Sequence, residues 1–225
     1  MARFITLVAL AVATLAVPRL AHAQWGNPGI DFTDTLERDI MYDRIRSSPN
    51  DSSTRSAPAR STSVAKRAVA RIPAMMAADG PADKRAALTQ EYELLLSTYE
   101  TLAAKLKLPD HDLAGALALF ICGSYVAYHG TDISNAALLA TSRQLHEMLG
   151  HHAAFAKLTT DQKQDMYEQL AILSTTMVLG RERAMGDQAQ LAQVRALGRQ
   201  YLAGFVDPDR LQITDRGIGL APRTR

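Results

Sequence analysis

The sequence predicts an all-α protein, a compact bundle of about five helices around one central apolar helix at residues 110–129. Residues 113–128 contain no formal charge and are apolar on nearly every side, so neighbours or lipid must cover such a helix. Elsewhere, apolar residues recur at alternating intervals of three and four. No window shows the strict alternation of a strand bounded by turn signals, which favours helices throughout.

The central segment is too short to favour a membrane span. Residues 113–128 would rise only about 24 Å as a helix, whereas the core of a bilayer is about 30 Å thick. We therefore expect other helices of the same chain to cover this segment, and no transmembrane span in the mature chain.

The first 23 residues have the pattern of a secretory signal peptide. Arg3 provides the basic start, residues 4–17 the apolar run, and Ala21-His22-Ala23 the small-x-small cleavage pattern. No cysteine follows the run at the place where a lipid-modified cysteine would stand. The sequence thus predicts a periplasmic or secreted protein, cleaved near Ala23.

Charge and cysteine content limit the class of partner and the source of stability. The chain has 25 basic and 23 acidic residues, and loss of Arg3 and Arg19 with the signal peptide would balance them. The overall charge therefore indicates no nucleic-acid partner. The single cysteine, Cys122, lies in the central helix and cannot form an internal disulfide, so stability must come from a packed core.

Residues 24–63 are expected to form a flexible N-terminal segment and linker, because their later part is rich in Ser, Pro, Thr and Arg and has little to bury. The linker overlaps a basic segment at residues 44–72. That segment could settle against an anionic envelope surface or an acidic partner, or it could be a soluble linker only. Its basic residues are Arg44, Arg46, Arg55, Arg60, Lys66, Arg67 and Arg71.

The helical domain is expected over residues 64–219. Spacing by four predicts a weak helix at residues 64–72, interrupted by Pro73. The pattern at residues 81–106 predicts an amphipathic helix, with Asp79 as a capping side chain. Its apolar stripe could cover the central helix or form the seam of a homodimer. The stripe consists of Leu88, Tyr92, Leu95, Tyr99, Leu102 and Leu106.

Capping signals divide the rest of the domain into helices. Gly130 is expected to end the central helix, and residues 131–134 to start the next one, which Gly150 would end. Two capping-box patterns, Thr159-x-x-Gln162 and Asp187-x-x-Gln190, would start the last two helices, separated by a stop at Gly186.

The C-terminal part is expected to leave the bundle. Residues 211–217 should form an extended tail that packs through Leu211 and Ile213, and residues 220–225 should be a loose end.

Five short motifs occur together within residues 64–219. They are Leu108 to Asp110, Tyr125 to Gly130, Leu158 to Met166, Gly186 to Leu191 and Ile213 to Gly217. With the signal peptide and spacer, this arrangement resembles a family of secreted bacterial all-helical domains of unknown function. The resemblance implies the helical fold. It implies no catalytic residue and no ligand, because the family has none assigned.

The string from His146 to His152 is the most suggestive for chemistry. A zinc-protease helix needs its second histidine four residues after the first, and that position is Gly150 here. We therefore favour a helix end with cations near its negative pole. The alternative is a metal or small-ligand site, conceivably of a hydrolase, formed by His146, His151 and His152 with His129 as a fourth group.

Other candidates have structural interpretations. Cys122 is expected to be a core residue, since Tyr125 stands where a papain-like nucleophile would be. Asp207-Pro208-Asp209 is expected to be a turn rather than a calcium loop. Helical carboxylates are assigned to solvent faces, without an acid/base pair; they include Glu91, Glu93, Asp165 and Glu168.

The sequence therefore predicts a non-enzymatic binding or interaction protein of the bacterial cell envelope, without a cofactor. Its partner would be a protein or another envelope component.

Overall fold

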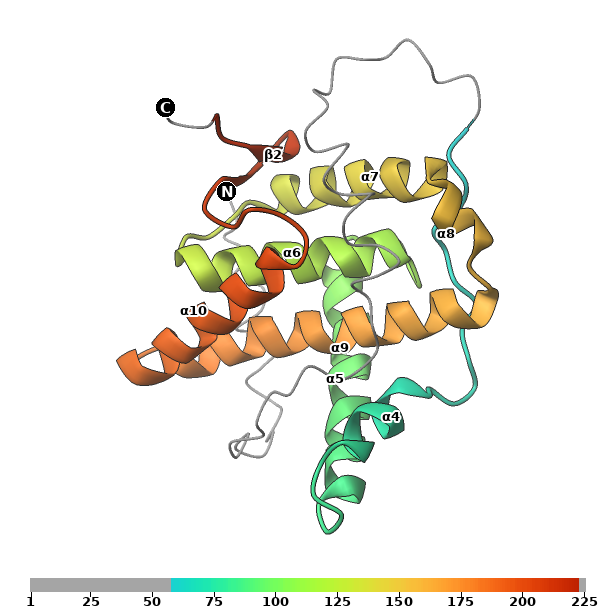
Figure 1. The fold of residues 1–225 in the computed structure, drawn as a ribbon, viewed down its shortest axis with the longest axis vertical. Helices are drawn as coiled ribbons and strands as arrows, with labels where there is room; N and C mark the ends of the chain where they lie inside the picture. The colour runs from blue at the N-terminus through green and yellow to red at the C-terminus, as the bar shows by residue number, and fades with distance from the viewer. Residues whose placement is uncertain (1–57, 223–225) are drawn as a thin grey trace.

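The computed structural model describes residues 58–222 (Figure 1). The predicted signal peptide, residues 24–57 of the expected linker and the last three residues lie outside this range. The described residues form a mainly helical fold, as predicted, with seven helices and one two-stranded sheet. The helices are α4 (Ile72–Ala78), α5 (Arg85–Lys105), α6 (Leu113–His129), α7 (Asn135–His151), α8 (Ala153–Lys157), α9 (Thr160–Ala184) and α10 (Gln188–Ala203). The strands are β1 (Leu211–Thr214) and β2 (Gly217–Leu220).

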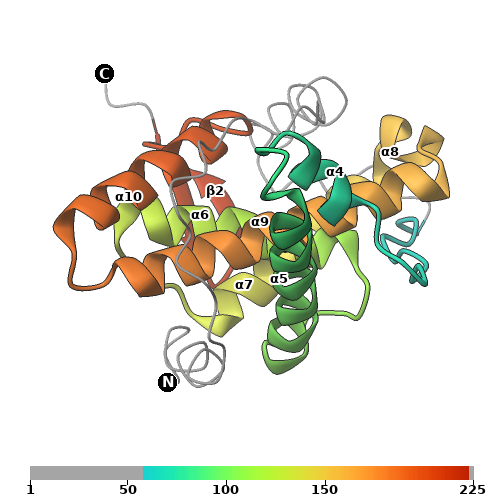
Figure 2. The same ribbon diagram turned by 90° about the horizontal axis from the view of Figure 1, so that it is seen from below.

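Helix α6 is the buried centre of the fold, which confirms the prediction made from its apolar sequence. Every residue from Leu113 to Ser124 is buried. Helices α7 and α9 run beside it and α10 packs against it (Figures 1 and 2). Asp112 caps its start by accepting a hydrogen bond from the Gly115 N–H at 2.8 Å, and Gly130 ends it with a φ of 72°. Among residues 58–222, no helix is both long and apolar enough to cross a membrane.

Helix α5 crosses α9 steeply, and the C-terminal half of its apolar stripe is buried there (Figures 1 and 2). Tyr99 meets Tyr167 edge to face, with ring centroids 5.8 Å apart. This half of the stripe is therefore covered within one chain. The predicted cap at Asp79 is wrong: α5 begins at Arg85, because residues 81–84 form a separate turn.

Helix α4 replaces the helix predicted at residues 64–72. It begins at Ile72, and Pro73 lies in its first turn instead of interrupting a helix. Proline is tolerated there because the first N–H groups of a helix have no partner inside it. The N–H groups of Arg71 and Ile72 donate instead to the Glu168 carboxylate of α9, at 2.9 and 3.0 Å.

Gly150 does not end α7, which continues to His151. A Cβ at position 150 would lie 2.6 Å from the Arg60 carbonyl oxygen and 2.7 Å from Ala59 Cβ. The glycine is therefore explained by the close approach of another segment. The predicted helix end is one residue early, and His152 rather than Gly150 is the C-cap.

The expected extended tail is an antiparallel hairpin, in which Leu211 pairs with Leu220 and Thr214 with Gly217. Gly217 has a φ of 102°, as a tight turn requires. The side-chain amide of Gln144 donates to the Ile218 carbonyl at 3.1 Å and accepts from its N–H at 2.7 Å. This pair of bonds attaches β2 to α7.

Candidate functional site

The four histidines of the alternative metal or ligand site do not converge. His146 Nδ1 lies 2.7 Å from Thr62 Oγ1, and His151 Nε2 lies 3.3 Å from a carboxylate oxygen of Glu147. His152 Nδ1 accepts a hydrogen bond at the start of α8, and His129 Nε2 lies 3.2 Å from the Pro208 carbonyl. Within residues 58–222, no three His, Cys, Asp or Glu side chains are placed to share a metal ion.

Cys122 and the Asp207 to Asp209 segment have structural surroundings. Cys122 is fully buried, and this burial raises the pKa of its thiol to about 12, so the reactive thiolate is scarce near neutral pH. Asp209 lies in a turn, where it accepts hydrogen bonds from the Tyr128 hydroxyl and Arg199. The hydrogen bond from Tyr128 and, next, that from Arg199 lower the pKa of Asp209.

Residues 58–71, here called the strap, run along the ends of α6, α7 and α9. Arg60 N–H donates to the Gly150 carbonyl at 3.1 Å, and Val64 N–H to that of His111 at 2.8 Å. The buried hydroxyl of Thr62 donates to the Asp112 carboxylate. Residues 58–63, expected to belong to a flexible linker, are thus packed against the bundle.

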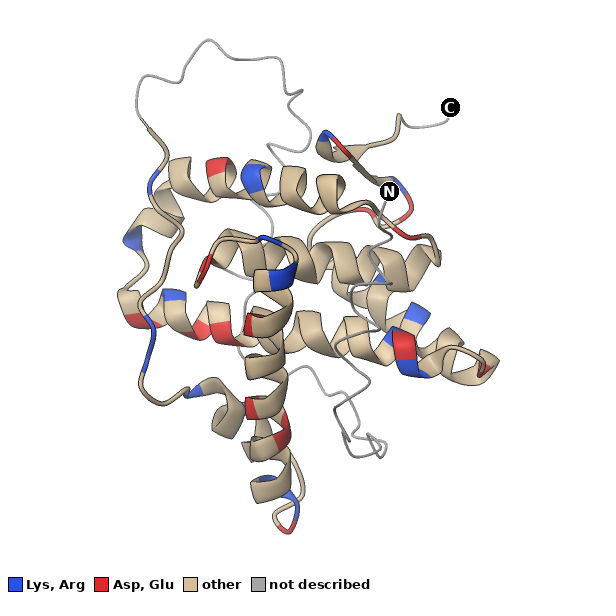
Figure 3. Cartoon of the chain, turned by 180° about the vertical axis from the view of Figure 1, so that it is seen from behind, with Lys and Arg blue, Asp and Glu red and all other residues tan. Residues whose placement is uncertain are grey.

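Two basic residues of the strap, Arg67 and Arg71, form ion pairs with acidic residues of α9, and Lys66 pairs with Glu100 of α5 at 3.4 Å. Figure 3 shows the charged positions along these segments. Arg67 forms ion pairs with Asp161, at 3.0 Å, and Asp165, at 2.5 Å. Arg71 reaches Asp165 at 2.6 Å. The assignment of Glu168 to a solvent face is wrong, because this side chain is only 1% exposed. Arg67 and Arg71 therefore have acidic partners within the chain, and Arg67 is largely buried while Arg71 is 55% exposed.

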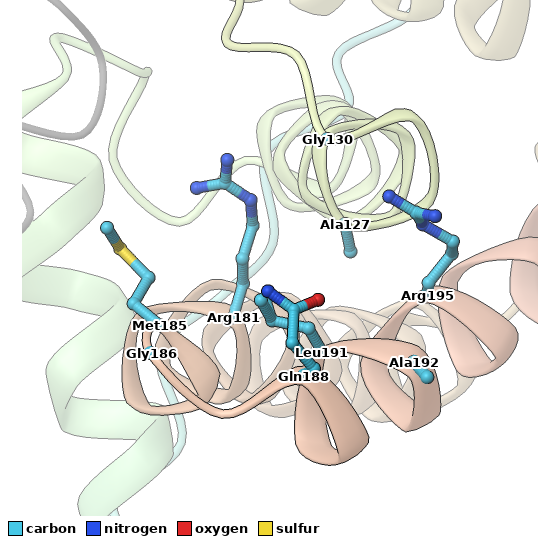
Figure 4. A pocket seen from close by; sticks show the side chains of 9 residues that line it. All are labelled: Ala127, Gly130, Arg181, Met185, Gly186, Gln188, Leu191, Ala192 and Arg195. Atoms are coloured by element: carbon cyan, nitrogen blue, oxygen red, sulfur yellow. The ribbon is translucent and has the colours of Figure 1, made fainter.

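An open pocket lies where the end of α6 meets the turn between α9 and α10 (Figure 4). Its volume is about 450 Å³, within the range of small-molecule sites. Chain geometry explains its position: Gly130 ends α6, and Gly186, with a φ of 94°, lets the chain reverse into α10. The lining residues are Ala127, Gly130, Arg181, Met185, Gly186, Gln188, Leu191, Ala192 and Arg195.

Two arginines from successive helices stand on the two flanks of this pocket, with Ala127 between them in the view of Figure 4. Arg181 Nη2 lies 3.4 Å from Asp132, and its Nη1 lies 4.0 Å from Glu182. Arg195 has no carboxylate oxygen within 4 Å among the described residues. The pocket therefore carries a positive charge that the described part of the chain leaves partly uncompensated.

The chemistry of the lining suits binding. None of its nine described residues is a serine, cysteine, histidine or carboxylate, so the lining supplies no nucleophile and no general base. Guanidinium groups and one amide provide hydrogen-bond donors beside apolar surface. Sequence reasoning missed this pocket, because Arg181 and Arg195 lie 14 positions apart on different helices and carry no motif.

When the chain is compared with known proteins, one family model matches it. Residues 3–221 match the family described as "Family of unknown function (DUF6683)". Neither the curated proteins nor the solved structures contain a match.

Proposed function

Since this chain belongs to the DUF6683 family, whose function is unknown, we propose that it is an exported, non-enzymatic binding protein of the bacterial cell envelope. One observation carries the binding part of the proposal: the open pocket between α6, α9 and α10. Concave sites with apolar walls and a few polar groups are the usual places where proteins hold small ligands.

Two features support binding without catalysis. The pocket lining holds donors and apolar groups but no group that could attack a substrate or take up its proton. Two groups elsewhere that could do so are engaged in the fold: Cys122 is buried, and Asp112 caps α6 while it accepts from Thr62.

Export is proposed from the N-terminal pattern alone. The test is to express the full chain, separate the cell fractions and determine the N-terminus of the product. We expect a chain that begins near Gln24, outside the cytoplasm. An uncut chain that remains in the cytoplasm would contradict this part.

Binding is tested with small-molecule extracts of the envelope fraction, by the rise in melting temperature that a ligand of the folded state causes. Replacing Ala192 by Trp should fill the pocket and abolish the rise. Replacing Ala196 by Trp, one turn further along α10 and outside the lining, should preserve it. A rise that survives Ala192→Trp would place the ligand elsewhere. Mass spectrometry should recover the bound ligand chemically unchanged, and its conversion would refute the non-enzymatic role.

A further inference from the structure

The two arginines of the pocket have hydrogen-bonding capacity to spare. Arg195 is exposed and forms no hydrogen bond or ion pair with the described residues, so all its donors face solvent or the pocket. The Nη1 atom of Arg181 is buried and has no hydrogen-bond acceptor within the described range. A guanidinium group has five N–H donors and no acceptor, and a group with several oxygens can accept more than one of these hydrogen bonds at once.

A purely structural role explains part of this arrangement. Both arginines lie near the end of α6, whose carbonyl groups make that end partly negative, and cations there are stabilising. Arg195 Nη2 would lie 3.6 Å from a Cβ at position 130, which places it beside this end. This role requires only charge, however, and Nη1 of Arg181 still has no hydrogen-bond acceptor among the described residues, since the Glu182 carboxylate oxygen lies 4.0 Å from it.

The neighbouring lining residues add an apolar surface and one more polar group. Leu191 and Ala192 come from α10, and Ala127 from α6. Met185 is 59% exposed, so its side chain is available as apolar surface at the pocket. The Gln188 amide lies between the stems of the two arginines in Figure 4. A ligand with a charged end and an apolar body would match both parts of the pocket.

We infer that the pocket binds a small ligand with one oxyanion group, a carboxylate or a phosphate, attached to a short apolar body. The oxyanion lies between Arg195 and Arg181, because planar guanidinium groups match the geometry of both anions. The apolar body lies on Leu191, Ala192 and the Met185 side chain. This inference rests on the proposed binding function and specifies its ligand class.

The test uses the full chain and three probes with the same five-carbon alkyl chain: hexanoate, pentyl phosphate and the neutral hexanamide. Isothermal titration calorimetry is carried out up to about 10 mM, which nearly saturates a site with a dissociation constant of about 1 mM. At least one of the two anions should bind about tenfold tighter than hexanamide. The tighter anion identifies the source of the charge, carboxylate or phosphate.

Substitutions assign the effect to the pocket. Arg195→Gln should weaken binding of the anion about tenfold and leave hexanamide unaffected, since charge-assisted bonds are the stronger ones. Arg195→Lys should be intermediate, because it keeps the charge and loses the planar fork. The control is Arg143→Gln, an exposed arginine on α7 outside the lining, which should change nothing. Arg195 is exposed, so Arg195→Gln should lower the urea unfolding midpoint only slightly, through the lost charge beside the end of α6, and this is measured in parallel.

The outcomes of these experiments distinguish a wrong ligand class from a wrong binding site. Equal affinity for all three probes, insensitive to Arg195→Gln but lost in Ala192→Trp, would overturn the oxyanion assignment while a binding pocket remained. If no probe bound, the assigned ligand class would be wrong. The envelope-extract experiment with Ala192→Trp would still show whether the pocket binds a ligand. Anion binding that persists in Arg195→Gln and in Ala192→Trp would place the site elsewhere and overturn the inference.

Discussion

Glu168 joins two segments that lie about 100 positions apart in the sequence. Its Oε2 accepts from the N–H groups of Arg71 and Ile72, and its Oε1 accepts from Gln164 at 3.1 Å. Arg67 supplies the nearest opposite charge, with Nη1 at 3.5 Å. A buried carboxylate is costly unless donors surround it, and here four donors do so. This single side chain therefore fixes where α4 begins.

Glu168→Gln should lower the free energy of unfolding by about 2–3 kcal/mol. In glutamine, an NH2 group replaces one of the two carboxylate oxygens and would face the donor of either Gln164 or Ile72. That buried donor would lose its acceptor. Urea denaturation measures the loss. The matched control is Glu93→Gln on an exposed position of α5, which should change stability little. Equal stability of both variants would show that α4 is held by apolar contacts alone.

Asp209 gives the protein a predictable response to acid. Because Tyr128 and Arg199 lower its folded-state pKa below the ordinary value of 3.8, the carboxylate adds stability above that value. The contribution is lost as the pH falls through the lowered pKa. Asp209→Asn should therefore be less stable than the wild type by a constant amount from neutral pH down to the ordinary pKa, and the difference should shrink below it.

Urea unfolding at a series of pH values from neutral to strongly acidic tests this expectation for Asp209. Asp83→Asn, at an exposed position before α5, serves as the control and should follow the wild type at every pH. A difference that grew on acidification would mean that the Asp209 carboxylate is not stabilised by Tyr128 and Arg199.

Helices α6 and α10 approach each other closely at Gly198. A Cβ there would lie 2.7 Å from the Ser124 carbonyl oxygen and 3.2 Å from Ala127 Cβ, so the backbones would have to separate. The approach matters for the pocket, because Ala127 and Arg195 come from these same two helices.

Gly198→Ala should lower the free energy of unfolding by about 1–3 kcal/mol, even though alanine is normally the better helix former. Gly180→Ala in α9 is the matched control. Its nearest neighbour would be Val194 Cγ2 at 3.9 Å, so we expect a gain of about 0.5–1 kcal/mol. Thermal and urea unfolding of both variants show whether each substitution raises or lowers the free energy of unfolding. If both variants were more stable than the wild type, α10 would be able to move away from α6 at little cost in free energy.

Sequence reasoning located those helix ends whose caps are local. Ser134 accepts from Ala137 N–H, and the Thr159–Gln162 capping box forms in both directions, because each partner lies three residues away. Two of the failures depend on distant partners. Glu168 caps α4 across the fold, and Gln144 attaches β2 from 74 positions away. Such contacts leave no short-range pattern in the sequence.

The pocket could not be predicted for a similar reason. In the sequence, Arg181 and Arg195 are ordinary basic residues of helices α9 and α10, and only the reversal at Gly186 brings the two helices together beside the end of α6. The histidines of the alternative metal site show that closeness in sequence does not make a site. His146 and His151 are close in sequence, but their partners are Thr62 and Glu147.

At the scale of the whole molecule, the strap closes one end of the bundle. Its backbone forms hydrogen bonds with three residues of the bundle. The Arg60 N–H donates to the Gly150 carbonyl, the Val64 N–H donates to the His111 carbonyl, and the Thr62 carbonyl accepts from the Leu113 N–H at 3.0 Å. These bonds connect α7 and the start of α6, while Arg67 and Arg71 reach α9. Opening the strap would therefore release three helices at once.

Native-state amide exchange should find the N–H groups of Arg60 and Val64 protected, because both donate to carbonyls of the bundle. Gly150→Ala should raise their exchange rates at least about tenfold, which corresponds to about 1.4 kcal/mol. The reason is steric, since the added methyl would lie 2.6 Å from the Arg60 carbonyl oxygen. Amides in the middle of α6 should keep their protection, and Gly180→Ala should leave the strap unchanged. Exchange of Arg60 and Val64 in the wild type at the rate of a free peptide would contradict the closure of the bundle by the strap.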